Sequence, residues 1–169
     1  MAHMVFTTPP QTQEVIVTRF FDAPRGIVFK TVTDPLLVPQ WWGPRRLTTR
    51  VIKMVVTPGG AWRILQWDNE GREYAFHGVY HDVVIPDRLV YTMEFEGFPG
   101  HPVLVTDQFS DLDGTATMTS KTVFQSIDDR DQMLQWGMEE GSRETTERIQ
   151  ALIARNEFQI EFEKEGQLE

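Results

Sequence analysis

The sequence predicts a single α+β domain in which a long C-terminal helix lies across a curved antiparallel sheet. Between residues 46 and 124, β-branched and aromatic runs alternate with short turns rich in Gly, Pro, Asn and Asp, a pattern typical of consecutive strands. Loops this short join antiparallel neighbours, because parallel pairs need crossovers of about a dozen residues. From residue 128 to about 155 there is no proline, and apolar residues recur at steps of three or four, which indicates a helix.

The ends of the chain are expected to lie outside this domain. Residues 1–13 are polar and contain a proline pair, so we expect a disordered arm. Its first four residues, MAHM, resemble a remnant of an expression vector. Residues 156–169 are acidic and are expected to form a frayed tail, which leaves 14–155 as the folded domain.

Two short helices are expected between the first and second strands. The run EVIVTRFFD at 14–22 predicts the first strand. Pro24 suits the first turn of a helix over 25–33, and residues 34–44 carry a second helical turn that ends at a Gly-Pro pair. Six further strands, which bring the sheet to seven, are predicted at 47–56, 60–68, 72–85, 88–97, 102–111 and 115–124.

Loop lengths predict which residues face each other, because hairpin register follows from the turn. Two-residue turns are expected at Pro86-Asp87 and Asp113-Gly114, and a three-residue loop at 69–71. The predicted pairs are Val84–Leu89, Asp82–Tyr91, Tyr80–Met93, Ile64–Phe76, Trp62–Gly78, Phe109–Met118 and Val103–Phe124. These pairs gather the large apolar residues on one face of the sheet, and only the final helix is long enough to cover it.

The final helix carries two glycines at positions that face the sheet. Ser126 and Asp129 predict its capped start, and Gly137 and Gly141 fall four residues apart on nearly one face. Each glycine costs about 1 kcal/mol relative to Ala in a helix interior. Either the sheet approaches closely there, or the missing side chains leave room for a ligand.

The composition of the chain disfavours several classes of function. The net charge of −9 and the pI near 4.9 disfavour nucleic-acid and membrane-surface partners. The absence of cysteine excludes disulfides and thiolate sites and fits a reducing, cytoplasmic compartment. No apolar run approaches the roughly 18 residues of a membrane-spanning helix, and the N-terminus lacks the features of a secretion signal.

The candidate site is the apolar face itself. Trp62, Ile64, Phe76, Tyr80, Tyr91 and Met93 form the expected inner cluster. They either complete the core or line a pocket, and the two tyrosine hydroxyls favour the pocket because buried hydroxyls need partners. Trp41 fits a structural wedge at the junction of the short helices and the sheet, whereas Trp42 fits a wedge and a pocket wall equally well.

Catalytic and metal sites are weakly indicated. Asp82 and Asp107 fall on the inner face by register, where burial would raise the pKa of a carboxyl and suit it to acid–base work. Asp82 is only a few residues from the turn, however, so a solvated position at the rim of this face fits it better. His77 and His81 lie about 13 Å apart on one strand, too far to share a metal ion. No phosphate-binding loop, nucleotide motif or nucleophile triad is present, so no catalytic residue, metal or cofactor is predicted.

Several segments resemble a known family. They are VTRFFDAPRGIVFKTVTDPLLVPQWWGP, PGGAWRI, FHGVYHDVVIPDRLVYT and MLQWGMEEGSRETTERI, and the resemblance covers about residues 14–153. They are similar to the family named for the activator of the 90-kDa heat-shock protein ATPase, within the START-like, or birch-allergen-like, SRPBCC superfamily. The resemblance implies a helix-grip fold, a seven-stranded sheet around a long helix with a hydrophobic cavity. Family members often carry Trp after GMEEG, where this chain has Ser142, so the resemblance does not identify a ligand.

The sequence therefore predicts a protein that binds a small apolar or aromatic molecule between sheet and helix. The alternatives are a chaperone-interacting protein of the heat-shock activator kind, and an enzyme of the cyclase, dehydratase or hydrolase kind. The chain is expected to be a monomer or a homodimer. The predicted ligand-binding residues are Trp42, Trp62, Ile64, Phe76, Tyr80, Tyr91, Met93, Met133, Gly137 and Gly141.

Overall fold

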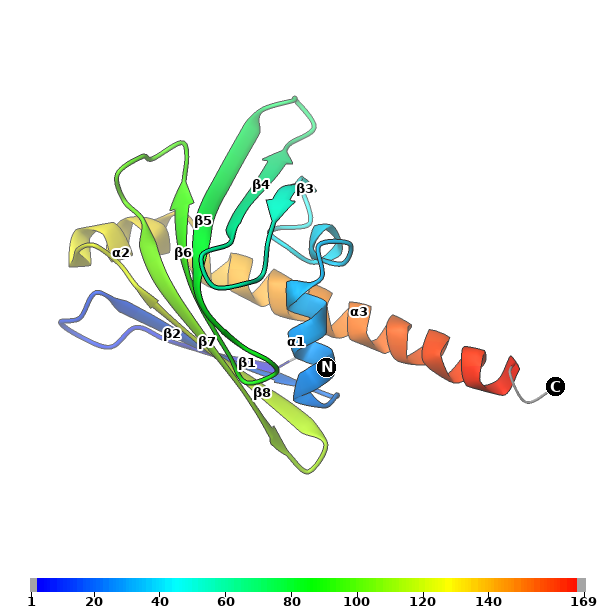
Figure 1. Cartoon of the computed structure of the whole chain (residues 1–169). Coiled ribbons are helices and arrows are strands. Elements are labelled where there is room, and N and C mark those ends of the chain that lie inside the picture. Colours follow the sequence, from blue (N-terminus) through cyan, green and yellow to red (C-terminus); the bar gives the residue numbers. More distant parts are fainter. Residues whose placement is uncertain (1–2, 167–169) are drawn as a thin grey trace.

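The computed structural model describes residues 3–166 of the chain, with the side chains of residues 3–156. Eight strands form one antiparallel sheet in the order β1-β2-β8-β7-β6-β5-β4-β3. The sheet is strongly curved, and α3 runs across it and projects beyond its edge (Figure 1). The strands are β1 (His3–Thr7), β2 (Glu14–Phe21), β3 (Thr48–Met54), β4 (Ala61–Trp67), β5 (Glu73–Val84), β6 (Arg88–Phe95), β7 (Val103–Leu112) and β8 (Thr115–Val123). The helices are α1 (Arg25–Thr33), the 3-10 turn η1 (Val38–Gln40), α2 (Ile127–Gln135) and α3 (Met138–Gly166).

The α+β class and the seven expected strands are confirmed, and each strand lies within two residues of its expected limits. Two short helical elements, α1 and η1, lie between β2 and β3 as expected. The registers predicted from the two glycine turns are also confirmed, with Ile64 opposite Phe76 and Phe109 opposite Met118. The apolar residues of β4, β5, β7 and β8 therefore share the face that the loop lengths assigned to them.

The N-terminal segment is a strand, not the disordered arm that its composition suggested. β1 pairs antiparallel with β2, with Val5 opposite Thr18. Met4 and Phe6 pack against a small apolar cluster that includes Val17. Burial of these side chains, together with the backbone hydrogen bonds that cover the edge of β2, stabilises the strand. The sheet consequently has eight strands instead of seven.

The β5–β6 register differs from the prediction. The connection has three residues, 85–87, where two were expected, and a bulge between Tyr80 and Asp82 shifts the pairing again. Tyr80 now lies opposite Tyr91. The bulge inserts one residue, which turns Asp82 away from the inner face. Its carboxylate is exposed and lies 3.8 Å from the Arg88 guanidinium, so the expected inward position of Asp82 is wrong.

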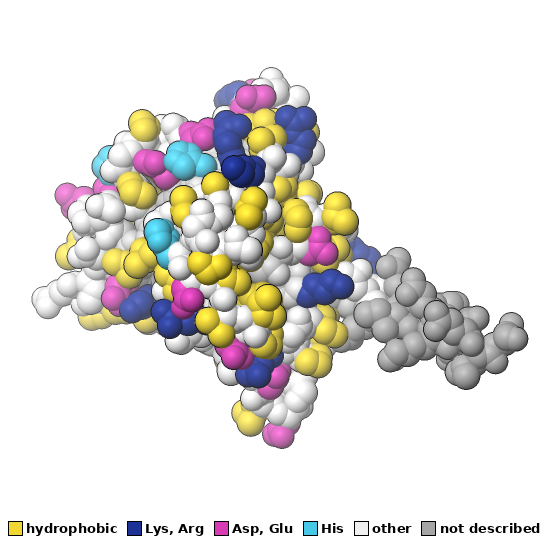
Figure 2. Space-filling view, in the orientation of Figure 1, with side chains coloured by type: hydrophobic (Ala, Val, Ile, Leu, Met, Phe, Trp, Pro, Cys, Tyr) yellow, Lys and Arg dark blue, Asp and Glu magenta, His cyan; other side chains and the backbone are white. Residues whose placement is uncertain are grey.

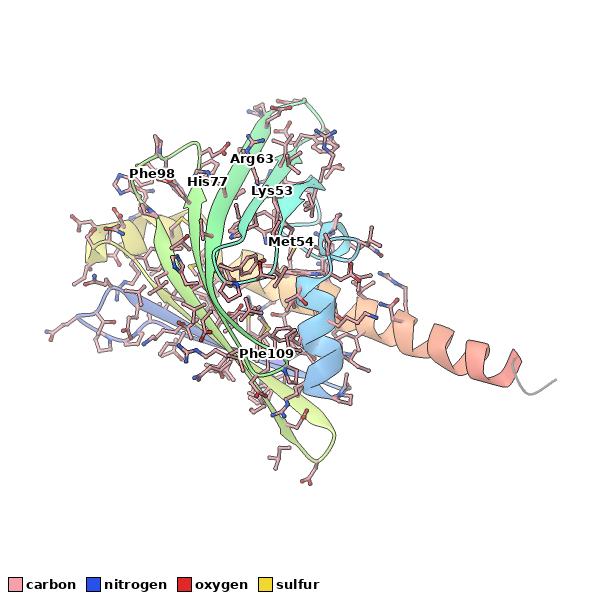
Figure 3. The ribbon with its side chains drawn as sticks, viewed as in Figure 1. Lys53, Met54, Arg63, His77, Phe98 and Phe109 are labelled. Atoms are coloured by element: carbon pink, nitrogen blue, oxygen red, sulfur yellow. The ribbon has the colours of Figure 1, made fainter. Side chains whose placement is uncertain are left out.

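The short helices pack between the sheet and α3. α1 contacts both α3 and the β7–β8 hairpin, as the side-by-side ribbons in Figure 1 show. Phe29 of α1 meets Phe109 of β7 edge to face, with ring centroids 5.1 Å apart. Phe109 is labelled in Figure 3. Trp41 is buried, and its indole Nε1 donates to the Thr31 carbonyl at 2.9 Å. The structural role predicted for Trp41 agrees with these contacts, since its only polar atom binds the end of α1.

The C-terminal helix is two helices, not one. Ser126 caps α2 as predicted, because its Oγ accepts a hydrogen bond from the Asp129 amide at 3.0 Å. The chain leaves helical geometry after Gln135, and Gly137 adopts a φ of +90°. A left-handed glycine just after a helix is a common helix stop. Gly137 is therefore a break between α2 and α3, not the helix-interior residue that the spacing suggested.

α3 continues beyond the expected end of the folded part. Its backbone is helical through Gly166, where the sequence predicted fraying after residue 155, and residues 167–169 of the expected tail lie outside the described residues. Over the described range, no helix combines the length and the apolar character that crossing a membrane requires.

The two glycines should respond oppositely to alanine. Gly137→Ala places a Cβ in the left-handed region, which costs about 1–2 kcal/mol. Gly141→Ala is the matched control inside α3 and should stabilise by about 1 kcal/mol through helix propensity. Urea denaturation followed by circular dichroism measures both. Equal effects of the two substitutions would contradict the helix break.

Candidate ligand-binding cavity

A cavity of about 330 Å³ lies between the inner face of the sheet and α3. Most of its wall is apolar or aromatic, and it receives side chains from seven strands, α1, η1 and both C-terminal helices. Small-molecule sites usually have volumes of about 300–1,000 Å³. Nine of the ten residues selected from the sequence line it: Trp42, Trp62, Ile64, Phe76, Tyr80, Tyr91, Met93, Met133 and Gly141.

Aromatic rings form one side of the cavity. Trp42 meets Phe76 edge to face at 4.9 Å and Trp62 at 6.5 Å, and Trp62 in turn meets Tyr91 at 6.3 Å. Trp62 Nε1 donates to the Thr92 carbonyl at 3.2 Å, so its polar atom is satisfied and its ring offers an apolar surface. The rings hold one another in edge-to-face geometry, the arrangement that aromatic quadrupoles favour. This side of the cavity is therefore rigid and suited to a flat, apolar guest.

The helix side of the cavity is open at Gly141. A Cβ built at Gly141 would meet no atom within 4 Å outside its own helix backbone, and Gly141 lies among the lining residues together with Ser142 and Thr145. Close packing therefore does not explain this glycine, whereas open volume does. Gly137 is the exception among the predicted residues: it lies at the α2–α3 break and not among the lining residues.

α2 is attached to the sheet by the loop between β6 and β7. Phe98 in this loop (Figure 3) stacks on His101 at 3.8 Å and meets Trp136 edge to face at 5.5 Å. His101 Nδ1 lies 2.8 Å from an Asp129 carboxylate oxygen on α2. These contacts fix α2 beside the sheet, and Met133 of α2 thereby becomes part of the cavity wall.

One part of the cavity wall is polar and buried. Arg19 of β2 is 8% exposed; its Nε donates to Thr146 Oγ1 of α3 at 2.9 Å and its Nη1 to Ser120 Oγ of β8 at 3.0 Å. Asp107 of β7, 3% exposed, lies directly opposite Ser120 in the β7–β8 pair. A cation and a carboxyl group thus lie near one another in the wall of an otherwise apolar cavity.

Burial controls the protonation of this cluster. Loss of water raises the pKa of the Asp107 carboxyl, although the Ser120 hydroxyl and the Arg19 charge act in the opposite direction. Burial and then the Asp107 charge raise the pKa of Tyr80 and place that of Tyr91 well above its ordinary value. Both tyrosines therefore remain neutral hydroxyls at physiological pH. Burial also lowers the pKa of Arg19, and the charge of Asp107 partly restores it.

Arg19 and Ser120 were not among the predicted site residues, although strand alternation gave a signal for both. In EVIVTRFF the buried positions alternate, so Arg19 follows Val17 and precedes Phe21 on the inner face. Ser120 follows Met118 on the inner face of β8 in the same way. A polar residue in such a register points inward even though its chemistry suggests solvent.

The histidines do not contribute to the cavity. His77 lies on the outer face near Arg63 of the neighbouring strand (Figure 3), with ring nitrogens 3.1 Å from carboxylates of Glu94 and Glu96. The Glu96 carboxylate also accepts two hydrogen bonds from Arg63, which lower its pKa to about 2. In the described part of the chain, no group of three or more potential ligand side chains could hold a metal ion.

The curved sheet, the helix across it and the mainly apolar cavity between them define a helix-grip cavity protein. The chain belongs to the Activator of Hsp90 ATPase homolog 1-like protein family, whose model matches residues 22–154. This agrees with the resemblance carried by the sequence segments. The comparison with curated proteins gives no match.

Solved structures of bacterial proteins share the fold. A protein from Arthrobacter aurescens is 24% identical with a TM-score of 0.83, and 89% of this chain and 91% of that chain are covered. A Rhodobacter sphaeroides protein is 20% identical with a TM-score of 0.82 and coverages of 90% and 99%. Protein Ms6760 from Mycobacterium smegmatis is 23% identical with a TM-score of 0.78 and coverages of 88% and 94%. At these identities the similarity establishes the fold alone.

Proposed function

We propose that the protein binds a small, mainly apolar molecule, preferably one with an aromatic ring, in the cavity between the sheet and α3. The observation that carries this proposal is the open volume beside Gly141, which faces the Trp42–Trp62–Phe76 wall. A helix glycine that nothing crowds is retained at a cost in helix stability. Occupancy of the volume by a ligand offsets that cost when the ligand is bound.

Binding should raise the melting temperature of the purified protein. A ligand present at a hundred times its Kd stabilises the fold by about 2.7 kcal/mol, or roughly 5–11 °C for a chain of this size. A library of apolar and aromatic compounds, screened by differential scanning fluorimetry, measures the shift. Mass spectrometry of an organic extract of the protein identifies any co-purified molecule. If no compound shifts the melting temperature and the extract is empty, the proposal fails.

A second candidate function is acid–base catalysis in the same cavity, of the cyclase, dehydratase or hydrolase kind. Asp107 supports it, because a buried carboxyl with a raised pKa beside two neutral tyrosine hydroxyls can exchange a proton with a bound substrate. Incubating each bound compound with the protein and analysing it by mass spectrometry tests this. Turnover that is lost in Asp107→Asn would favour the enzyme, whereas unchanged compounds favour a carrier.

The family description also suggests a chaperone-binding role, but the surface of the protein supports this role less than the cavity supports ligand binding. The most exposed large apolar side chains come from four separate places in the fold: Leu36, Ile85 and Trp136 lie in three different connections, and Leu112 ends β7. On the face drawn in Figure 2, apolar side chains are interspersed with charged and polar ones. A protein-binding surface is usually a contiguous apolar patch. The interior of this protein is therefore the better candidate for a binding site.

A further inference from the structure

The polar cluster in the cavity wall contains one atom without a protein partner. Asp107 Oδ1 is buried and accepts no hydrogen bond from any described group of the protein. Buried side-chain oxygens in folded proteins nearly always have a partner, so an exception requires an explanation. Because Asp107 lines the cavity, a bound molecule can supply the missing donor when the carboxyl group rotates to present this oxygen to the cavity.

The neighbouring groups do not satisfy this oxygen. The Arg19 guanidinium directs its hydrogen bonds to the hydroxyls of Ser120 and Thr146. The Ser120 and Tyr91 hydroxyls act on the Asp107 carboxyl group and lower its pKa, yet neither forms a hydrogen bond with Oδ1. The positive charge of Arg19 nevertheless acts on the Asp107 carboxylate and favours the charged form. The pair is therefore close to neutral as a unit, while one carboxylate oxygen keeps its capacity to accept a hydrogen bond.

Because the charges of Arg19 and Asp107 offset each other, the cavity should favour an uncharged polar group on the ligand over a charged one. An amine would add a second cation to a buried site that Arg19 already neutralises. A carboxylate would bring a second anion to the buried Asp107, which repels it. A hydroxyl donates one hydrogen bond and carries no charge, and the rest of the ligand meets Trp62, Leu89 and Met93.

We propose that Asp107 Oδ1 accepts a hydrogen bond from the hydroxyl group of an otherwise apolar, ring-containing ligand. This inference rests on the proposed function, because it concerns the occupant of the same cavity. It adds the class of ligand, an apolar alcohol or phenol, and the atom that distinguishes it from the corresponding hydrocarbon.

A matched series of ligands tests the inference on the unmodified protein. The series is 2-naphthol, 2-methylnaphthalene, 2-(aminomethyl)naphthalene and 2-naphthoate, with binding measured by calorimetry at pH 7. We expect 2-naphthol to bind about tenfold more tightly than 2-methylnaphthalene, the advantage of one hydrogen bond to a buried acceptor. Equal affinity of these two, or tighter binding of the amine or the acid, would overturn the inference and leave the carrier function standing. Failure of all four compounds and of the wider library would overturn both.

Variants identify the accepting atom. Asp107→Leu should remove the preference for 2-naphthol while 2-methylnaphthalene still binds, and Asp107→Asn, which keeps the shape of the side chain, should reduce the preference because its oxygen is uncharged. Asp82→Asn is the matched control, since that carboxylate lies on the outer face, and it should keep the full preference. A preference that persists in Asp107→Leu, or one that is undiminished in Asp107→Asn should the leucine variant not fold, refutes the assignment.

Discussion

Replacing Gly141 by phenylalanine is expected to weaken the binding of apolar compounds at least tenfold while making the protein more stable. The Cβ position of Gly141 is open and lies in the cavity wall, so a benzyl group there occupies the space that a ligand would use. Burial of the phenylalanine ring should stabilise the protein by about 1.5–3 kcal/mol. The higher helix propensity of phenylalanine relative to glycine adds a few tenths of a kcal/mol. The substitution therefore fills the cavity instead of disrupting the fold.

Gly141→Ala is the matched control for this experiment. It gains helix propensity but adds a single carbon, so it should stabilise the protein and leave ligand affinity nearly unchanged. Calorimetric titration with the best compound from the library, together with thermal melts, measures affinity and stability in both variants. A phenylalanine variant that binds as tightly as the unmodified protein would show that the ligand lies elsewhere.

Most of the sheet could be predicted because its turns are local. Gly71 and Gly114 have φ of +80° and +77°, the left-handed geometry that fixes a tight turn, and both hairpins have the register that their turns dictate. Once the register of a hairpin is fixed, side-chain alternation assigns each residue to a face. Trp62, Ile64 and Phe76 were located by this reasoning alone.

The remaining features depend on contacts that are distant in sequence. The bulge in β5 inserts a residue that loop counting cannot detect, and it reverses the face of Asp82. β1 forms a strand because its backbone pairs with the edge of β2 and because Met4 packs against an apolar cluster. The helix break at Gly137 has the same local sequence signal as a glycine inside a helix, so periodicity could not separate them.

The polar part of the site is harder to predict, because charged and hydroxyl side chains usually face solvent. Only strand alternation indicates the inner face for Arg19, through Val17 and Phe21 on either side of it. The cost of burying a guanidinium makes such a position rare, and a buried arginine in a cavity wall is therefore a candidate for a functional role. Alternation applied strictly to β2 and β8 would have found the cluster.

Arg19→Met is expected to destabilise the protein by about 3 kcal/mol, because it removes one member of a buried charge pair and leaves the other without compensation. The substitution also removes the hydrogen bonds to Ser120 and Thr146, which connect β2, β8 and α3. For a chain of this length, the loss lowers the melting temperature by roughly 6–12 °C. Chemical denaturation and thermal melts at pH 7 measure it, and a change of less than about 0.5 kcal/mol would show that Arg19 does not stabilise the cluster.

The deficit of Arg19→Met should also depend on pH, with a sign that follows from Asp107. The pKa of Asp107 in the folded protein is raised above its ordinary value of about 3.9, so the folded state retains a proton that the unfolded chain has lost. Stability contributed by this group is full below the unfolded pKa and is lost as pH rises through the folded pKa. Without Arg19 the folded pKa rises further, and the deficit should therefore grow between pH 4.5 and pH 7.

The double substitution Arg19→Met with Asp107→Leu separates loss of charge compensation from loss of packing. Replacing a whole buried ion pair by apolar residues is often neutral or stabilising, whereas removing one partner is not. We expect the double variant to recover most of the stability lost in Arg19→Met and to lose its pH dependence. If it remained as unstable as the single variant, the contribution of Arg19 would lie in its packing and in its hydrogen bonds to the two hydroxyls. The charge of Asp107 would then have no part in holding this wall of the cavity together.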